Sequence, residues 1–274
     1  MPQPETFARD AFLFAHTARE LMSRLDLLAV MPERIVDVGA HDTQFSQQLA
    51  AHYKAAQITA VEPWQQLLPG SQTRRWPWQK RRIQPSSNVL TDLPLADHSA
   101  QMAVANLSLV RYAEPDAVLN EIARVLQPGG AFLMATLGPD TLRELRDAWQ
   151  SADAQHAHVA TFTDMHDVGD ALVRNGFAEP VLDVERLTLR YTSVDALWRD
   201  LGAHAARNRL PDARKGLTGK NTFSQMTQNL QNDDGTFEIS VEVVYAQSWG
   251  QERRSSPDPS GDIRISPTSI RRRV

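Results

Sequence analysis

The chain has 274 residues, of which 42% are hydrophobic and 23% charged, the composition of an ordinary globular protein with room for one large domain and an extension. The absence of cysteine excludes disulfides, thiolate metal sites and thiol nucleophiles, and the net charge of −4 gives no general attraction to nucleic acid or to anionic membranes. No apolar stretch approaches the roughly 20 residues that span a bilayer, and the acidic N-terminal region does not resemble a signal or transit peptide, so we expect a cytoplasmic protein.

Strands and helices are predicted to alternate along the chain. Leucines recur near a 3.6-residue period in residues 6–30 and predict a first helix. Beyond it, short apolar runs predict strands, and amphipathic stretches predict the helices between them. The strands are expected at 35–38, 58–61, 102–107, 131–137, 182–191 and 237–243, and the helices at 44–53, 116–126, 140–149, 165–175 and from Ser193 onward. Prolines make residues 65–88 irregular, and residues 207–220 are expected to form a basic loop.

This alternation predicts an α/β fold with an open, mostly parallel sheet. The final strands alternate polar and apolar residues, which indicates an antiparallel edge with one face open to water. We divide the chain into a helical segment at 1–30, an α/β domain at 31–250 and a disordered tail at 251–274. The domain carries a helical and basic insertion at about 193–232, and the tail is rich in proline, serine and arginine.

The turn after the first strand is the most informative feature. The apolar run at 35–38 contains Asp37 and ends at Gly39, and a second apolar run a helix later ends at Glu62. Parallel sheets hold nucleotide-type cofactors in this way, because glycine lets the backbone approach the ligand and the later acid binds the ribose hydroxyls. A full Gly-x-Gly-x-Gly turn would place further glycines where this chain has His41 and Thr43.

Four motifs, in this order and spacing, resemble class I S-adenosylmethionine-dependent methyltransferases. They are VDVG at 36–39, VEP at 61–63, DLPLAD at 92–97 and ARVLQPGG at 123–130. The resemblance implies a Rossmann-like seven-stranded sheet in the order 3-2-1-4-5-7-6, with strand 7 antiparallel and helices on both faces. Further segments look like the biotin-synthesis malonyl-carrier-protein O-methyltransferase family, to which a family of respiratory complex I assembly factors is related. They are LGPDTLREL at 137–145, DMHDVGDAL at 164–172, RKGLTGK at 214–220 and EVVY at 242–245.

The resemblance implies S-adenosylmethionine as cofactor and a small acyl or carrier-protein-bound carboxylate, of malonyl type, as methyl acceptor. The residues it assigns to the cofactor are Asp37, Gly39, Ala40, His41, Glu62, Asn88, Val89 and Asn106. The residues we assign to an acceptor or anion site are Arg207, Arg209, Arg214, Lys215 and Lys220. No catalytic residue is identified, although Asn106 and Ser108 are candidates for positioning, and we identify no metal site. Because His41, Thr43 and Val89 depart from the family pattern, we expect weak cofactor binding.

Two functions remain open at this point. The first is an active methyltransferase, which needs no general base for a carboxylate acceptor, because that nucleophile is already ionised at pH 7. The second is a methyltransferase-like protein with a degenerate cofactor site that acts as a non-catalytic partner or assembly factor. A basic and aromatic segment at 74–82 favours nucleic acid only weakly, and neither a nucleic-acid nor a membrane partner is expected. The sequence does not fix the oligomeric state.

Overall fold

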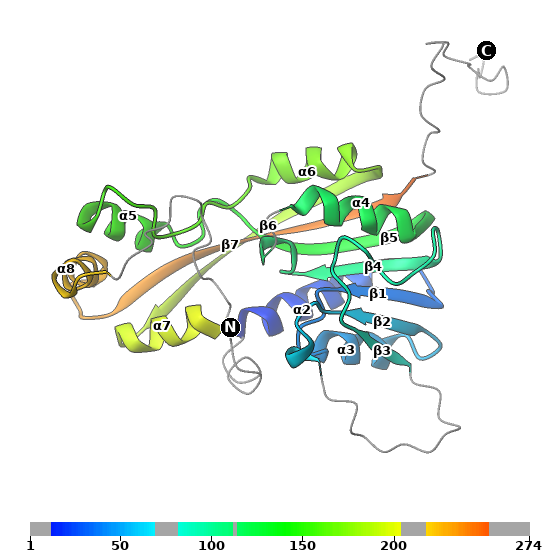
Figure 1. Cartoon of the computed structure of the whole chain (residues 1–274), viewed down its shortest axis with the longest axis horizontal. Coiled ribbons are helices and arrows are strands. Elements are labelled where there is room, and N and C mark those ends of the chain that lie inside the picture. Colours follow the sequence, from blue (N-terminus) through cyan, green and yellow to red (C-terminus); the bar gives the residue numbers. More distant parts are fainter. Residues whose placement is uncertain (1–11, 69–81, 112–113, 204–217, 252–274) are drawn as a thin grey trace, which may run out of the picture.

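The computed structural model describes residues 12–68, 82–111, 114–203 and 218–251. One seven-stranded sheet runs through this part of the chain in the order β3-β2-β1-β4-β5-β7-β6 (Figure 1). The strands are β1 (Arg34–Val38), β2 (Gln57–Val61), β3 (Ile83–Ser86), β4 (Ala100–Asn106), β5 (Leu126–Leu137), β6 (Phe177–Tyr191) and β7 (Phe237–Gly250). The pairs among β1 to β5 are parallel, whereas β7 is antiparallel to both β5 and β6. The predicted fold class and strand order are confirmed.

Helices cover both faces of this sheet. They are α2 (Phe12–Leu25), α3 (Gln44–His52), α4 (Pro115–Val125), α5 (Arg143–Ala152), α6 (Met165–Arg174), α7 (Val194–Ala203) and α8 (Lys220–Leu230). Side chains alternate across a strand, so Ile35 of β1 packs with α2 and α3, whereas Val36 and Val38 pack with α4 and α6 on the opposite face. None of the described helices combines the length and apolar composition needed to cross a bilayer.

Strands β6 and β7 form a long hairpin that extends beyond the carboxyl end of β5. Strand β5 ends at Leu137, opposite Val243, whereas β7 already begins at Phe237, opposite Tyr191. Helices α5, α7 and α8 surround this extension and share a separate apolar cluster with it. Figure 1 shows the three helices gathered at one end of the molecule. The extension therefore stands beside the carboxyl edge of the parallel strands, where ligands bind in folds of this kind.

Two elements were missing from the sequence-based prediction. Strand β3 lies within the stretch expected to be irregular, and Pro85 is tolerated there because β3 is an edge strand whose outer side needs no backbone donor. Helix α8 begins at Lys220, which we had placed at the end of a loop. Its sequence is mostly polar, and Met226 and Leu230 are its buried residues, so its apolar stripe was too thin to predict a helix.

Candidate active site

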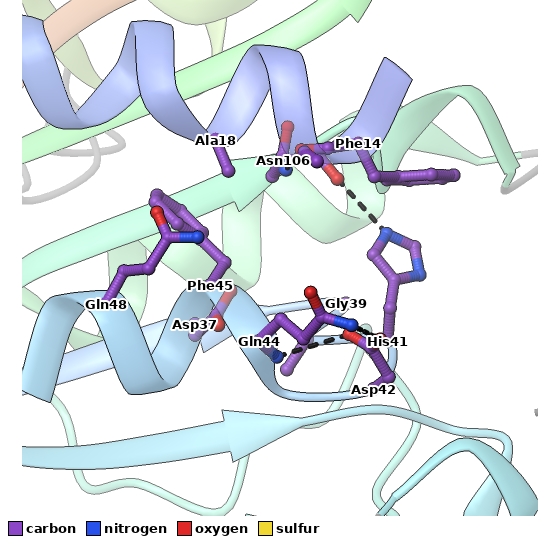
Figure 2. A pocket seen from close by; sticks show the side chains of 12 residues that line it. Phe14, Ala18, Asp37, Gly39, His41, Asp42, Gln44, Phe45, Gln48 and Asn106 are labelled. Carbon is purple, nitrogen blue, oxygen red and sulfur yellow. Dashed lines mark hydrogen bonds between the residues drawn. The ribbon is translucent and has the colours of Figure 1, made fainter. Parts of the chain in front are cut away.

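A pocket lies at the carboxyl edge of the sheet, between the β1–α3 turn and helix α2 (Figure 2). Three segments that are distant in the sequence form its wall: helix α2, the turn with the start of α3, and the end of β4. The lining residues are Phe14, Ala15, Ala18, Asp37, Gly39, Ala40, His41, Asp42, Gln44, Phe45, Gln48 and Asn106. Five of the eight predicted cofactor residues are among them, so the structure brings most of that set together.

The β1–α3 turn is fixed by the neighbouring strands. The backbone N–H groups of Gly39 and Ala40 both donate to the carbonyl of Val61, at 2.8 and 2.9 Å. Gly39 has φ +75°, and a Cβ built on it would lie 2.3 Å from the Cβ of Ser108. Glycine is therefore required at this position by the close approach of the β4 end as well as by its backbone conformation.

The two positions at which the glycine pattern fails are also left-handed. His41 has φ 50° and Thr43 has φ 65°. L-residues adopt this conformation at a cost of roughly 1–2 kcal/mol each, which explains why a glycine turn suits this site. The chain keeps the backbone path of a glycine-rich turn while carrying two side chains on it.

Asp37 is a buried carboxyl group with one satisfied oxygen. Its Oδ2 accepts a hydrogen bond of 2.5 Å from the Ser46 hydroxyl, and its Oδ1 has no hydrogen-bond partner among the described residues. The pKa of Asp37 is raised to about 7, chiefly by burial; the Ser46 hydrogen bond opposes the shift, and the nearby charges of Glu62 and Asp42 add to it. A buried oxygen of this kind, in the lining of a pocket, suits a cationic partner.

Glu62 is completely buried at the end of β2. Its Oε2 accepts from the backbone N–H of His41, and its Oε1 accepts from that of Trp64, both at 3.1 Å. The His41 Nδ1 lies 3.6 Å from the same Oε2. The Glu62 carboxylate thus lies against the β1–α3 turn.

The His41 side chain extends from the turn toward α2 (Figure 2). Its Nε2 lies 3.1 Å from the carbonyl oxygen of Asn106, and its ring packs edge-on against Phe14 with the centroids 4.2 Å apart. The pocket that remains has a volume of about 50 Å³, whereas sites that enclose a drug-sized ligand measure roughly 300–1,000 Å³. His41 and Phe14 together therefore narrow the space in which a ligand would lie.

Asn106 connects the end of β4 to helix α2. Its Nδ2 donates to the carbonyl of Phe14 at 3.0 Å, and its Oδ1 accepts from the Thr17 hydroxyl at 2.6 Å. Ser108, the other positioning candidate, packs against Gly39 and is absent from the lining of this pocket. Sequence reasoning missed Phe14, Thr17 and Ser46. Phe14 belongs to the ordinary apolar stripe of a helix, and Thr17 and Ser46 are short polar residues, so nothing in the sequence marks them as site residues.

The remaining predicted site residues lie elsewhere. Asn88 accepts a hydrogen bond from the Ser86 hydroxyl at 2.6 Å, and Val89 is exposed. Both follow β3 and are not among the residues that line this pocket. Lys220 is the exposed first residue of α8. The other basic candidates, Arg207, Arg209, Arg214 and Lys215, lie outside the described residues.

Comparisons with known proteins agree with this geometry. Residues 36–134 match the family model described as a methyltransferase domain. The malonyl-[acyl-carrier protein] O-methyltransferase of Laribacter hongkongensis is 37% identical over 273 residues, which cover 96% of this chain and 92% of that protein. The protein of the same name from Gallionella capsiferriformans is 35% identical, with the same coverage of both chains.

Solved structures support the fold. A putative methyltransferase from Bacillus halodurans superimposes with a TM-score of 0.60 at 12% identity, over 85% of this chain and 100% of that one. Because its relatives resemble it over nearly their full length, this chain belongs to the class I S-adenosylmethionine-dependent methyltransferases, within the family of the malonyl-[acyl-carrier protein] O-methyltransferases.

Proposed function

We propose that this protein methylates the free carboxylate of a malonyl group carried on an acyl carrier protein, with S-adenosylmethionine as methyl donor. The observation that carries the proposal is the similarity, at 37% identity over 96% of the chain, to a relative named for that reaction. The match covers 92% of that relative, so the likeness extends well beyond the segments that line the pocket and includes the part of the fold that would bind the acceptor. The hairpin extension and its helices are part of the matched region.

The pocket chemistry fits the proposed cofactor. When bound, S-adenosylmethionine supplies an activated methyl group on a positively charged sulfonium, and it also carries an ammonium group. Asp37 lines the pocket near the end of β1, Glu62 follows the adjacent strand β2, and no lysine or arginine occurs among the described lining residues. We assign the Asp37 Oδ1, which has no hydrogen-bond partner among the described residues, to the ammonium group and Glu62 to the ribose hydroxyls. The narrow pocket requires that the His41 side chain move when the cofactor enters.

Positioning, and not proton transfer, would account for the catalysis. A malonyl carboxylate is ionised at pH 7 and needs no general base. Holding a nucleophile in line with a reacting carbon can contribute on the order of 7–11 kcal/mol at best. Asn106 is suited to a positioning role because its backbone carbonyl contacts His41 while its side chain is held by Phe14 and Thr17.

We assign the acceptor site to the segment between α7 and α8. Both helices pack on the hairpin extension beside the carboxyl edge, so a segment that joins them begins and ends on the acceptor side. Arg207, Arg209, Arg214, Lys215 and Lys220 would bind the acceptor carboxylate or the acidic surface and phosphate of a carrier protein. Arginine offers two-pronged recognition of carboxylates, and lysine offers a point charge suited to phosphate.

The test is methyl transfer to defined carrier-protein substrates. Purified protein would be incubated with S-adenosylmethionine and malonyl-carrier protein, and the product would be examined by mass spectrometry for one added methyl group. Acetyl-carrier protein is the matched control, because it has the same thioester and carrier but no free carboxylate. Methylation of the malonyl form alone is expected. Cofactor binding without transfer to the malonyl form would refute the proposed acceptor, and failure to bind cofactor at all would favour the non-catalytic alternative.

A further inference from the structure

Asp37 is a carboxyl group that is removed from water without a cation beside it. It lines the pocket from the β1 side (Figure 2) and is 1% exposed. Its Oδ1 is shielded from water and has no hydrogen-bond partner among the described residues, and no lysine or arginine occurs among the described lining residues. A buried carboxylate must be paired or neutralised. The neutral, protonated form of Asp37 is therefore favoured while the pocket holds no ligand.

The groups around Asp37 favour the same form. Burial is the main cause that raises the pKa of Asp37 to about 7, and the charges of Glu62, after β2, and Asp42, in the turn, add to it. His41 lies in the same lining, and histidines ionise near neutral pH, so released protons must be assigned by comparison. The other elements contribute uncharged side chains: Phe14, Ala15 and Ala18 from α2, Gln44, Phe45 and Gln48 from α3, and Asn106 from β4.

Ser46 opposes this preference and prepares the ionised form. Its hydroxyl, buried on α3, donates to the Asp37 Oδ2 at 2.5 Å. A hydrogen bond to the charged form of a carboxyl group favours ionisation, and this one lowers the pKa of Asp37 against the effect of burial. Because Ser46 occupies Oδ2, Oδ1 is the oxygen left for a ligand. Ser46 acts through Asp37 and is a positioning residue.

We infer that the Asp37 carboxyl group is protonated in the free protein at mildly acidic pH, that the cofactor's ammonium group displaces this proton, and that Ser46 directs the ammonium to Oδ1. The inference deepens the proposed function and rests on it for the identity of the ligand. In the exchange the carboxyl O–H bond breaks, the proton passes to solvent, and an ammonium N–H donates to Oδ1. The buried carboxylate thus forms only together with its cation.

The number of protons released measures the exchange. With a pKa of about 7 in the free protein, roughly 90% of the molecules carry the proton at pH 6 and about half at pH 7. A neighbouring opposite charge lowers a carboxyl pKa by about 1–3 units. For a shift of about two units, binding should release about 0.8 proton at pH 6 and about 0.5 at pH 7, and the affinity should rise about fivefold between them.

Calorimetry in buffers of different ionisation enthalpy counts these protons. The ligands are S-adenosylhomocysteine, which carries the ammonium group, and its deamino analogue, which keeps the nucleoside, thioether and carboxylate. Both pH values lie below the ordinary α-amino pKa of about 7.7–8.0, so the ligand amine stays charged. We expect about 0.8 proton at pH 6 from the first ligand and less than about 0.2 from the analogue. Equal release from the two ligands would overturn the inference, because the proton would then come from another group such as His41.

The substitution Ser46→Ala removes the hydrogen bond and keeps Asp37. The pKa of Asp37 should rise, so proton release on binding S-adenosylhomocysteine at pH 7 should increase from about 0.5 toward about 0.8. Ser151→Ala is the control, because this serine donates to the Asp147 carbonyl at an exposed place on α5, and its proton count should match the wild type. A purely structural role of Ser46 would weaken binding without changing the count, so an unchanged or lower count would overturn the inference.

The carbon-13 NMR signal of the Asp37 carboxyl group tests the free protein without ligand. It would be assigned by its absence in Asp37→Asn, and its titration midpoint is expected near 7. A midpoint below about 6 would overturn the inference, because the group would already be ionised before the ligand binds. Binding of S-adenosylhomocysteine without proton release at pH 6 would overturn the exchange and leave the proposed function standing. If the protein does not bind it at any pH, the proposed function and the exchange fail together.

Discussion

The substitution Asp37→Asn should stabilise the protein at alkaline pH while weakening the proposed cofactor site. Burial raises the Asp37 pKa from 3.8 to about 7. The folded protein therefore binds this proton more tightly than the unfolded chain does, and the stability it confers is lost as the pH rises from about 4 through about 7. The shift is about three units, and each unit is worth 1.36 kcal/mol, so ionised Asp37 costs the folded state about 4 kcal/mol above pH 7.

Asparagine keeps the acceptor oxygen for the Ser46 hydroxyl but cannot ionise. It introduces a buried amide N–H pair whose loss of hydration costs about 1–3 kcal/mol, and this cost does not depend on pH. The stability of the variant relative to the wild type should therefore increase between pH 5 and pH 8. Because pH 5 lies two units below the raised pKa, the free energy of unfolding of the variant relative to the wild type should be about 2–3 kcal/mol higher at pH 8 than at pH 5.

Urea unfolding of both proteins at pH 5 and pH 8 measures this difference directly. Asp147→Asn, at an exposed carboxylate on α5, is the control and should show no comparable change. The affinity of Asp37→Asn for S-adenosylmethionine should fall at least tenfold, because the buried ammonium loses its charged partner. The reasoning is refuted if the stability of Asp37→Asn relative to wild type is the same at the two pH values.

Three other substitutions test separate parts of the site. Gly39→Ala should destabilise the protein by about 2–5 kcal/mol in urea unfolding, because the new Cβ meets Ser108 at 2.3 Å and the left-handed backbone adds strain. If the second substitution Ser108→Gly restored the full stability, the clash would account for the whole effect and the backbone strain would be negligible. Thr17→Val should cost about 1–3 kcal/mol by leaving the buried Asn106 oxygen without its donor. Thr227→Val, which removes an exposed hydrogen bond within α8, should change the stability little, and equal effects of the two substitutions would contradict the α2 contact. Reversal of charge at Arg214 and Lys215 should abolish binding of the carrier-bound acceptor in a pull-down while cofactor binding and thermal stability stay nearly unchanged; normal acceptor binding would exclude the anion site.

The sequence determined the architecture because the governing pattern is local. A strand of five residues such as β1 shows its burial in its own apolar run, and the single helices after β1 and β4 return the chain to strands that run parallel to them. The carboxyl ends of parallel strands share one edge, so Asp37 and Glu62 could be placed at a common site from their positions at the ends of two runs. The antiparallel β7 was likewise visible in its alternation of polar and apolar residues.

The tertiary structure decided what these residues contact. Gly39 is required partly by Ser108, and His41 lies between Phe14 and the Asn106 carbonyl. Asn106, which we expected to face a ligand, uses its amide to hold helix α2. These partners are far apart in the chain, and no local propensity or period encodes which of them meet. Only the packing of distant segments makes the β1–α3 turn into one wall of a pocket that its own histidine narrows.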